Sequence, residues 1–199
     1  MASAAILAGG RASRFDGRDK SARVVGGRSI FERQLEELSR ITDDIMIVGA
    51  RWPSNPGGDI APRFVPDRVP GCGPLGGLDA ALAAARDDLV AVVACDMPFV
   101  TAEWLAYLLS CAEHWDAVVP RTERGYHPLC AVYTRGCGAA VARHLAEGRL
   151  TMMGLFEELR VHVVPSEELD AFGNRHRLLA NVNTPVEYEE IEALAGHER

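Results

Sequence analysis

The chain begins with a short apolar run that ends directly in two glycines. Residues 4–8 read Ala-Ala-Ile-Leu-Ala, and Gly9 and Gly10 follow them. An apolar run that ends in glycines, ahead of a segment with helical spacing, is typical of a β-strand that leads into a loop. Because glycine has no Cβ, the backbone N–H groups of such a loop can approach phosphate oxygens closely. The first residues therefore predict a strand followed by an anion-binding loop.

Positive charge is concentrated immediately after these glycines. From Arg11 to Arg28 the sequence holds six basic and two acidic side chains, although the protein has a net charge of −7. Lys20 is the only lysine, and the other 20 basic residues are arginines. Lysine carries a compact point charge whereas arginine is a planar fork, so a single lysine beside the loop indicates a position that needs a point charge. Codon bias that left one lysine is the alternative.

Apolar runs of strand length alternate with segments of helical spacing along the rest of the chain. We predict strands at residues 45–49, 63–65, 89–95, 116–119, 129–133, 161–164 and 178–182. We predict helices at residues 29–39, 102–113, 137–147 and 151–159, a helix that follows a second glycine loop (71–77) and ends at Arg86, and a last helix that starts at Pro185. This alternation predicts an α/β fold, a Rossmann-like three-layer sandwich with a mostly parallel central sheet and helices on both faces.

Several polar or glycine residues stand at predicted strand ends, which is where open sheets of this kind bind ligands. They are Gly9, Gly10, Gly49, Asp67 and Asp96. Asp96 follows the most apolar run of the chain, and a half-desolvated carboxylate is costly unless a cation pairs with it. In a site that holds a triphosphate the expected cation is Mg²⁺, which binds one or two carboxylates together with phosphate oxygens and water. A helix N-cap or an ion pair with arginine is the alternative for Asp96.

Length and composition narrow the class of protein. We expect one domain over residues 1–199, which is long enough for a full core. No apolar run reaches the roughly 18 residues of a membrane span, and no signal peptide is evident. The five cysteines include no C-x-x-C pair, which favours reduced thiols and a cytoplasmic location over a disulfide scaffold or zinc site. The net charge of −7 argues against general binding of nucleic acid, which is itself negatively charged.

The N-terminal loop resembles the signature of nucleotidyltransferases, which move a nucleoside monophosphate from a triphosphate to an acceptor phosphate. The matching residues are Leu7, Ala8, Gly9, Gly10, Ser13, Arg14, Gly17, Asp19 and Lys20. The likeness is closest to the molybdenum cofactor guanylyltransferases and extends to about Tyr188. Two residues, Phe15 and Asp16, separate Arg14 from Gly17 where the family pattern has one. The fingerprints of Rossmann dehydrogenases and P-loop proteins are both absent from this window.

The resemblance implies a nucleotide-diphospho-sugar transferase fold, with a nucleotide half at about residues 1–100 and an acceptor half at about 101–199. It implies catalytic roles for Lys20, Arg14 and Asp96, with Mg²⁺ on Asp96. The nucleotide-binding residues that it implies are Leu7, Ala8, Gly9, Gly10, Lys20, Gly49, Asp67 and Asp96. The acceptor-binding residues that it implies are Gly76, Gly77, His127, Asn181 and Asn183.

Each of these positions also has a plainer interpretation. Asp67 can accept two hydrogen bonds from guanine, hold the ribose hydroxyls, or satisfy a turn after Pro66. Gly76 and Gly77 can admit a ligand or simply start a helix. A lone histidine such as His127 is often structural, and Asn183-Thr184-Pro185 is also a good helix start.

The resemblance implies transfer of GMP from GTP to the terminal phosphate of molybdenum-bearing molybdopterin, with release of pyrophosphate. The implied partners are GTP and molybdopterin, with transient contacts to the proteins that supply molybdopterin and to the molybdoenzyme side. One rival is a cytidylyltransferase that acts on molybdopterin or another small phosphorylated acceptor. A rival of another class is a non-catalytic nucleotide-binding protein of the same fold.

Overall fold

The computed structural model describes residues 1–8, 24–25, 27–49 and 61–182, together with residues 186–187, 189–190 and 193. The strands in these residues are β1 (Ala2–Leu7), β2 (Val24–Val25), β3 (Arg28–Ser29), β4 (Ile45–Val48), β5 (Arg63–Val65), β6 (Leu89–Ala94), β7 (Ala117–Thr122), β8 (Gly125–Tyr126), β9 (Cys130–Thr134) and β10 (Val161–Pro165). The α-helices are α1 (Ile30–Ser39), α2 (Gly73–Ala84), α3 (Ala102–Ser110), α4 (Gly138–Ala146), α5 (Met152–Phe156), α6 (Ser166–Leu169) and α7 (Arg175–Leu178). Two 3-10 turns lie at Arg135–Cys137 and Asp170–Phe172.

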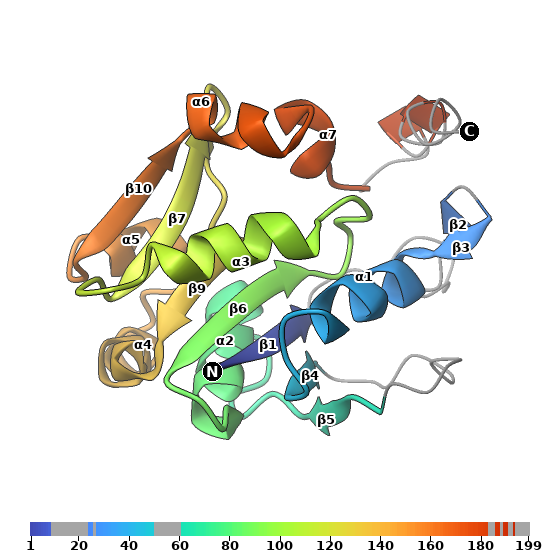
Figure 1. Ribbon diagram of the computed structural model, residues 1–199. Helices are drawn as coiled ribbons and strands as arrows, with labels where there is room; N and C mark the ends of the chain where they lie inside the picture. Colours follow the sequence, from blue (N-terminus) through green and yellow to red (C-terminus); the bar gives the residue numbers. More distant parts are fainter. Residues whose placement is uncertain are drawn as a thin grey trace.

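One sheet forms the centre of the molecule (Figure 1). Its strand order is β10-β7-β9-β6-β1-β4-β5, and β8 pairs with β7. Strands β6, β1, β4 and β5 are parallel to one another, and β10 is parallel to β7. Strand β9 is antiparallel to both of its neighbours, β6 and β7. The sheet is therefore mostly parallel, as predicted, with β9 as the main exception.

Side chains alternate between the two faces of the sheet because successive residues of a strand point to opposite sides. In β1, Ala4 and Ile6 join a core cluster with residues of α1 and α3, whereas Ala5 and Leu7 join a second cluster with residues of α2 and α4. Figure 1 shows α1 and α3 in front of the sheet and α2 behind it. Burial on both faces requires uniformly apolar strands, and the three-layer α/β fold is confirmed.

The start of α1 follows the prediction from the sequence. Ser29 is the N-cap, and its Oγ accepts a hydrogen bond from the backbone N–H of Glu32 at 3.1 Å. The Glu32 carboxylate accepts one in return from the backbone N–H of Ser29 at 2.9 Å. This reciprocal capping box satisfies backbone donors that the first turn of a helix leaves open. It fixes the point at which the chain enters α1 from β3.

Two stretches of the chain differ most from the predicted elements. The predicted glycine loop at 71–77 is shorter than expected, because α2 begins at Gly73 with Pro74 in its first turn, where proline is compatible with a helix. That helix ends at Ala84, before Arg86. The predicted strand at 178–182 is wrong, because Leu178 ends α7 and no strand is assigned to residues 179–182. The Asn174 side chain caps α7 by accepting hydrogen bonds from two backbone N–H groups, which favours a helix there.

Candidate functional site

The carboxyl ends of four parallel strands lie side by side at one edge of the sheet. The order β6-β1-β4-β5 brings the segments after these strands together. The backbone N–H of Cys95 donates to the Leu7 carbonyl at 3.2 Å, and that of Ala8 donates to the Val48 carbonyl at 2.7 Å. The N–H of Gly49 donates to the Val65 carbonyl at 3.1 Å. The pairing of these segments thus continues beyond the strands, at the edge where ligands bind in sheets of this kind.

Asp96 lies in a tight turn directly after β6. The backbone N–H of Met97 donates to the Ala94 carbonyl at 3.2 Å, which closes the turn around Cys95 and Asp96. Asp96 is half-buried, and its Oδ1 atom is fully enclosed. Met97 is almost fully buried in the core cluster beneath α1 and α3. The carboxylate is therefore anchored at the edge of the sheet by a turn that is packed into the core.

The segment after α7, near the C-terminal end of the described residues, contacts the Asp96 turn. The backbone N–H of Val182 donates to the Asp96 carbonyl at 2.9 Å, and the Val182 side chain is fully buried. Val182 packs with Ile30 and Phe99 in a small apolar cluster. Asn181, the residue before Val182, is exposed. One predicted acceptor residue thus lies next in sequence to a residue that is bonded to the Asp96 turn.

His127 lies at the same edge of the sheet, because the antiparallel strand β9 begins where β6 ends. Cys130 pairs with Val93 of β6, and the N–H of Ala94 donates to the Leu129 carbonyl at 2.8 Å. His127 is half-buried, and its Nε2 lies 2.8 Å from the Thr122 hydroxyl. Burial lowers the pKa of His127, and the nearby Arg124 guanidinium lowers that pKa further. The imidazole is therefore expected to be neutral at pH 7, with one nitrogen bound to the protein.

Asp67 follows β5 at the same edge, with one residue between it and the strand end. Its side chain is half-buried, and burial raises the pKa of the carboxyl above its ordinary value. A desolvated carboxylate of this kind gains from ligand donors that replace lost water. The position agrees with the predicted strand end, and its role toward a nucleotide stays a prediction.

Gly76 and Gly77 are buried within α2, where both make close contacts to the protein itself. A Cβ on Gly76 would lie 3.0 Å from Cys72 Cβ and 3.2 Å from the Val69 carbonyl oxygen. A Cβ on Gly77 would lie 3.4 Å from Leu7 Cδ1. The small residues therefore let α2 pack against its own preceding turn and against β1. The contacts account for a packing role of the two glycines, and their role in binding the acceptor stays a prediction.

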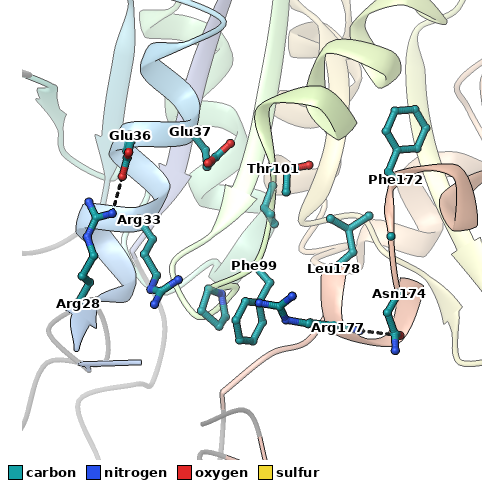
Figure 2. Close-up of a pocket in the computed structure, with 13 residues that line it drawn as sticks. Arg28, Arg33, Glu36, Glu37, Phe99, Thr101, Phe172, Asn174, Arg177 and Leu178 are labelled. Carbon is teal, nitrogen blue, oxygen red and sulfur yellow. Dashed lines mark hydrogen bonds and ion pairs between the residues drawn. The ribbon is translucent and has the colours of Figure 1, made fainter. Parts of the chain in front are cut away.

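A pocket of about 290 Å³ opens next to the Asp96 turn (Figure 2). Its lining residues come from three separate parts of the chain and include Arg28, Arg33, Glu36, Glu37, Pro98, Phe99, Val100, Thr101, Phe172, Gly173, Asn174, Arg177 and Leu178. The Arg177 guanidinium lies over the Phe99 ring at 4.3 Å from its centre, as Figure 2 shows. Arg28 is paired with Glu36 at 2.6 Å, and Glu37 with Arg40 at 3.1 Å.

The sequence alone did not predict this pocket, because no motif joins its three walls. The lining segments are residues 28–37, 98–101 and 172–178. The wall at 98–101 stands close in sequence to Asp96 and the wall at 172–178 to Asn181, whereas the wall at 28–37 has no predicted site residue next to it. A surface assembled from such distant segments appears only once the sheet and its helices are in place.

Several predicted residues lie outside the part of the chain that the structure describes. These are Gly9, Gly10, Arg14, Lys20 and Asn183. Within the described residues, Leu7, Ala8, Gly49, Asp67, Asp96 and His127 gather at one edge of the sheet. The arrangement there offers carboxylates and backbone groups from neighbouring strands.

The described residues contain no group of three or more His, Cys, Asp or Glu side chains that could hold a metal ion. A site closed by protein ligands, of the structural zinc type, is therefore not formed by these residues. The carboxylate of Asp96 suits Mg²⁺, which commonly takes one or two carboxylates and completes its octahedron with phosphate oxygens and water.

The described residues also include no helix long and apolar enough to cross a bilayer.

Comparison with known proteins places the chain among nucleotide-transferring enzymes. The family model described as "MobA-like NTP transferase domain" matches residues 4–163. A "Probable molybdenum cofactor guanylyltransferase" of Pelotomaculum thermopropionicum is 34% identical over 199 residues, which cover 100% of this chain and 96% of that protein. A "Molybdenum cofactor guanylyltransferase" of Desulfosudis oleivorans is 34% identical over 189 residues, or 94% of this chain and 93% of that protein.

Two solved structures are similar to this chain over nearly its whole length. The crystal structure of molybdopterin-guanine dinucleotide biosynthesis protein A from Archaeoglobus fulgidus has a TM-score of 0.81 and 25% identity, and the match covers 99% of this chain and 100% of that one. A 2-C-methyl-D-erythritol 4-phosphate cytidylyltransferase from Thermus thermophilus has a TM-score of 0.70 and 18% identity, over 96% of this chain and 98% of that one. The second likeness concerns the fold alone.

Proposed function

The chain belongs to the MobA-like NTP transferase family, and on that premise we propose that it transfers GMP from GTP to the terminal phosphate of molybdenum-bearing molybdopterin. The product is a molybdopterin guanine dinucleotide, and pyrophosphate leaves. The two relatives named as molybdenum cofactor guanylyltransferases, which match over more than nine-tenths of their length, support the choice of nucleotide and acceptor. The observation that carries the proposal is the position of Asp96 at the end of β6, between the ends of β1, β4 and β5 and the segment that contains Asn181.

Two neighbouring surfaces meet at the Asp96 turn. On one side lie the ends of β1, β4 and β5, with Asp67 as a candidate for the guanine base. On the other side lie Asn181, next to the Val182 N–H that binds the Asp96 carbonyl, and His127 near the start of β9. Holding two reactants in this way converts a bimolecular step into one within a complex, which is a large part of phosphoryl-group catalysis.

Charge neutralisation is the second requirement, because GTP and the acceptor are both polyanions. Mg²⁺ held by Asp96 would supply Lewis-acid stabilisation of the GTP phosphates. Lys20 and Arg14, which the sequence places in the glycine loop after β1, are proposed to offset the charge that grows on the α-phosphate and on pyrophosphate. The acceptor phosphate is already ionised and attacks in line, so the protein needs no general base.

Guanine selection is proposed to rest on Asp67. A carboxylate can accept parallel hydrogen bonds from the N1–H and the amino group of guanine, and adenine does not offer this pair. Cytosine offers a single amino donor on that edge. Asp67 is half-buried, and a desolvated carboxylate would discriminate more strongly than one fully exposed to water.

Calorimetry with GTP and CTP tests the choice of nucleotide. Each nucleotide is titrated with Mg²⁺ into the purified chain, and we expect GTP to bind at least about tenfold more tightly, the equivalent of one good hydrogen bond to a charged group. Equal or tighter binding of CTP would favour the cytidylyltransferase over the guanylyltransferase. The assay needs no acceptor, so it tests the base preference separately from transfer.

A further inference from the structure

Gln34 is a buried polar residue on the apolar face of α1. It is 2% exposed and lies among Ile30, Phe31, Leu35 and Leu38, the buried residues of that helix. Burying an amide is unfavourable unless it is hydrogen-bonded. An apolar residue at this position would fill the same core without that cost, so the amide needs a specific reason.

The Gln34 amide is bonded to the turn that carries Asp96. Its Nε2 donates to the Ala94 carbonyl at 2.7 Å and to the Met97 carbonyl at 2.9 Å. Both amide hydrogens are used, and the two acceptors flank Asp96 in sequence. Two carbonyl acceptors require a donor, so the chemistry of the contacts fixes the orientation of the amide.

Backbone hydrogen bonds between described residues also hold the same turn. The Met97 N–H closes the turn on the Ala94 carbonyl, the Cys95 N–H binds the Leu7 carbonyl, and the Val182 N–H binds the Asp96 carbonyl. All of these are backbone bonds, which substitution of a side chain leaves in place. Gln34 thus adds a side-chain tie between the turn and a helix on the face of the sheet.

We propose that Gln34 is a positioning residue that holds the Asp96 carboxylate in the orientation that binds the metal–nucleotide complex. The inference rests on the proposed function, since it requires Asp96 to be a metal ligand. Residues that hydrogen-bond to a metal-binding residue and fix its orientation change the metal affinity of the site, although they do not touch the metal themselves. Gln34 acts in this way through the backbone of residues 94–97.

A purely structural role for Gln34 makes a different prediction. If the amide served stability alone, its loss would lower the unfolding temperature and leave the metal affinity of the folded protein unchanged. If it positions Asp96, metal affinity falls in protein that is still folded. The two roles are therefore separated by measuring metal binding and unfolding on the same variants.

The experiment uses Mn²⁺ in place of Mg²⁺, because Mn²⁺ binding can be followed by electron paramagnetic resonance. Mn²⁺ is titrated into the full chain in the presence of a GTP analogue whose α,β linkage cannot be cleaved. The test variants are Gln34→Met, which keeps the length and removes the donor, and Gln34→Glu, which keeps the shape and places a carboxylate against two carbonyls. The control is Leu38→Ala, one helical turn further along the same buried face of α1, whose side chain makes no hydrogen bond to the turn.

We expect Gln34→Met and Gln34→Glu to weaken Mn²⁺ binding by at least about tenfold, the lower end of what such supporting residues contribute. Leu38→Ala is expected to lower the unfolding temperature as much or more, because it leaves a cavity, with Mn²⁺ affinity within about twofold of wild type.

Asp96→Asn separates the two possible failures. Wild-type Mn²⁺ affinity in folded Gln34 variants, alongside a large loss in Asp96→Asn, would overturn the positioning role alone. Wild-type affinity in Asp96→Asn would overturn the metal role of Asp96 and the positioning role with it. A loss in Leu38→Ala equal to that in the Gln34 variants would also overturn the proposal, because it would show that affinity follows stability.

Discussion

The backbone N–H of Val182 donates a hydrogen bond to the carbonyl oxygen of Asp96 at 2.9 Å. This bond joins the segment after α7 to the turn after β6, two parts of the chain that are far apart in sequence. Asn181 precedes Val182, so an acceptor held by Asn181 would lie beside the carboxylate proposed to carry the metal. Under the proposed function, this contact would place the acceptor and the nucleotide at the same edge of the sheet.

Lys20 is expected to be essential for transfer because it places a point charge beside the glycine loop. Lys20→Ala should reduce the rate of pyrophosphate release by at least about a hundredfold, by analogy with the loss of one donor to a developing oxyanion. Lys20→Arg is the matched variant, since it keeps the charge and changes its geometry. We expect it to lose most of the activity too. Wild-type turnover in Lys20→Ala would rule out this role.

Asp67 should make GTP binding depend on pH. Burial raises the pKa of its carboxyl, so protonation occurs at higher pH than for an exposed aspartate, and the proton removes an acceptor for guanine. The affinity for GTP is therefore expected to fall as the pH is lowered through this raised pKa. Calorimetry between about pH 8 and about pH 4 measures it, because this range lies above the ordinary aspartate pKa of about 3.9. Asp67→Asn should remove the part of the dependence that is due to this carboxyl and leave only that of the GTP phosphates, and the same fall in that variant would contradict the assignment.

Alanine substitution is expected to change the stability of the fold differently at Gly76 and at Gly77. Gly76→Ala puts a Cβ against backbone at Val69, and we expect it to destabilise the fold by about 1–3 kcal/mol, as overpacking does. Gly77→Ala meets the flexible end of Leu7 and gains helix propensity, so its effect on stability should stay within about 1 kcal/mol. Chemical denaturation measures both. An unchanged stability with a raised acceptor KM in Gly77→Ala would instead favour the predicted acceptor role.

Glu158 is expected to stabilise the contact between α4 and α5 in a pH-dependent way. The Arg143 guanidinium, followed by Arg149 and His144, lowers the pKa of Glu158 to about 2 from an ordinary 4.5. A lowered carboxyl pKa contributes stability that is full above the ordinary value and is lost as the pH falls through about 2. Glu158→Gln should therefore lower the unfolding temperature at neutral pH, and its difference from wild type should shrink below pH 4.5. A difference that does not change with pH would contradict this linkage.

Local signals in the sequence were enough to predict much of the sheet. Residues 63–65 form β5 as predicted, and Ser29 caps α1, because short apolar runs and capping residues act within a few positions. The segment 178–182 was predicted wrongly as a strand. Its apolar residues pack as the end of α7 and as a buried turn, since Leu178 and Leu179 complete the cluster under α3.

The residues that support the site were harder to predict because their partners are distant in sequence. Gln34 binds carbonyls 60 and 63 positions away. One signal was present, since Gln34 falls on the same helical face as Phe31 and Leu38 and interrupts an apolar stripe. The pocket beside Phe99 had no such signal, because α7 and the residues after β6 meet only in the folded chain.

The most direct test is to incubate the purified chain with GTP, Mg²⁺ and molybdenum-bearing molybdopterin and to identify the product by mass spectrometry. We predict a molybdopterin guanine dinucleotide with equimolar pyrophosphate. Formation should be at least about a hundredfold slower in Asp96→Asn and unchanged in Asp43→Asn, an exposed aspartate just before β4. GTP binding by the wild-type chain without dinucleotide or pyrophosphate would contradict the proposed transfer and favour a non-catalytic nucleotide-binding protein.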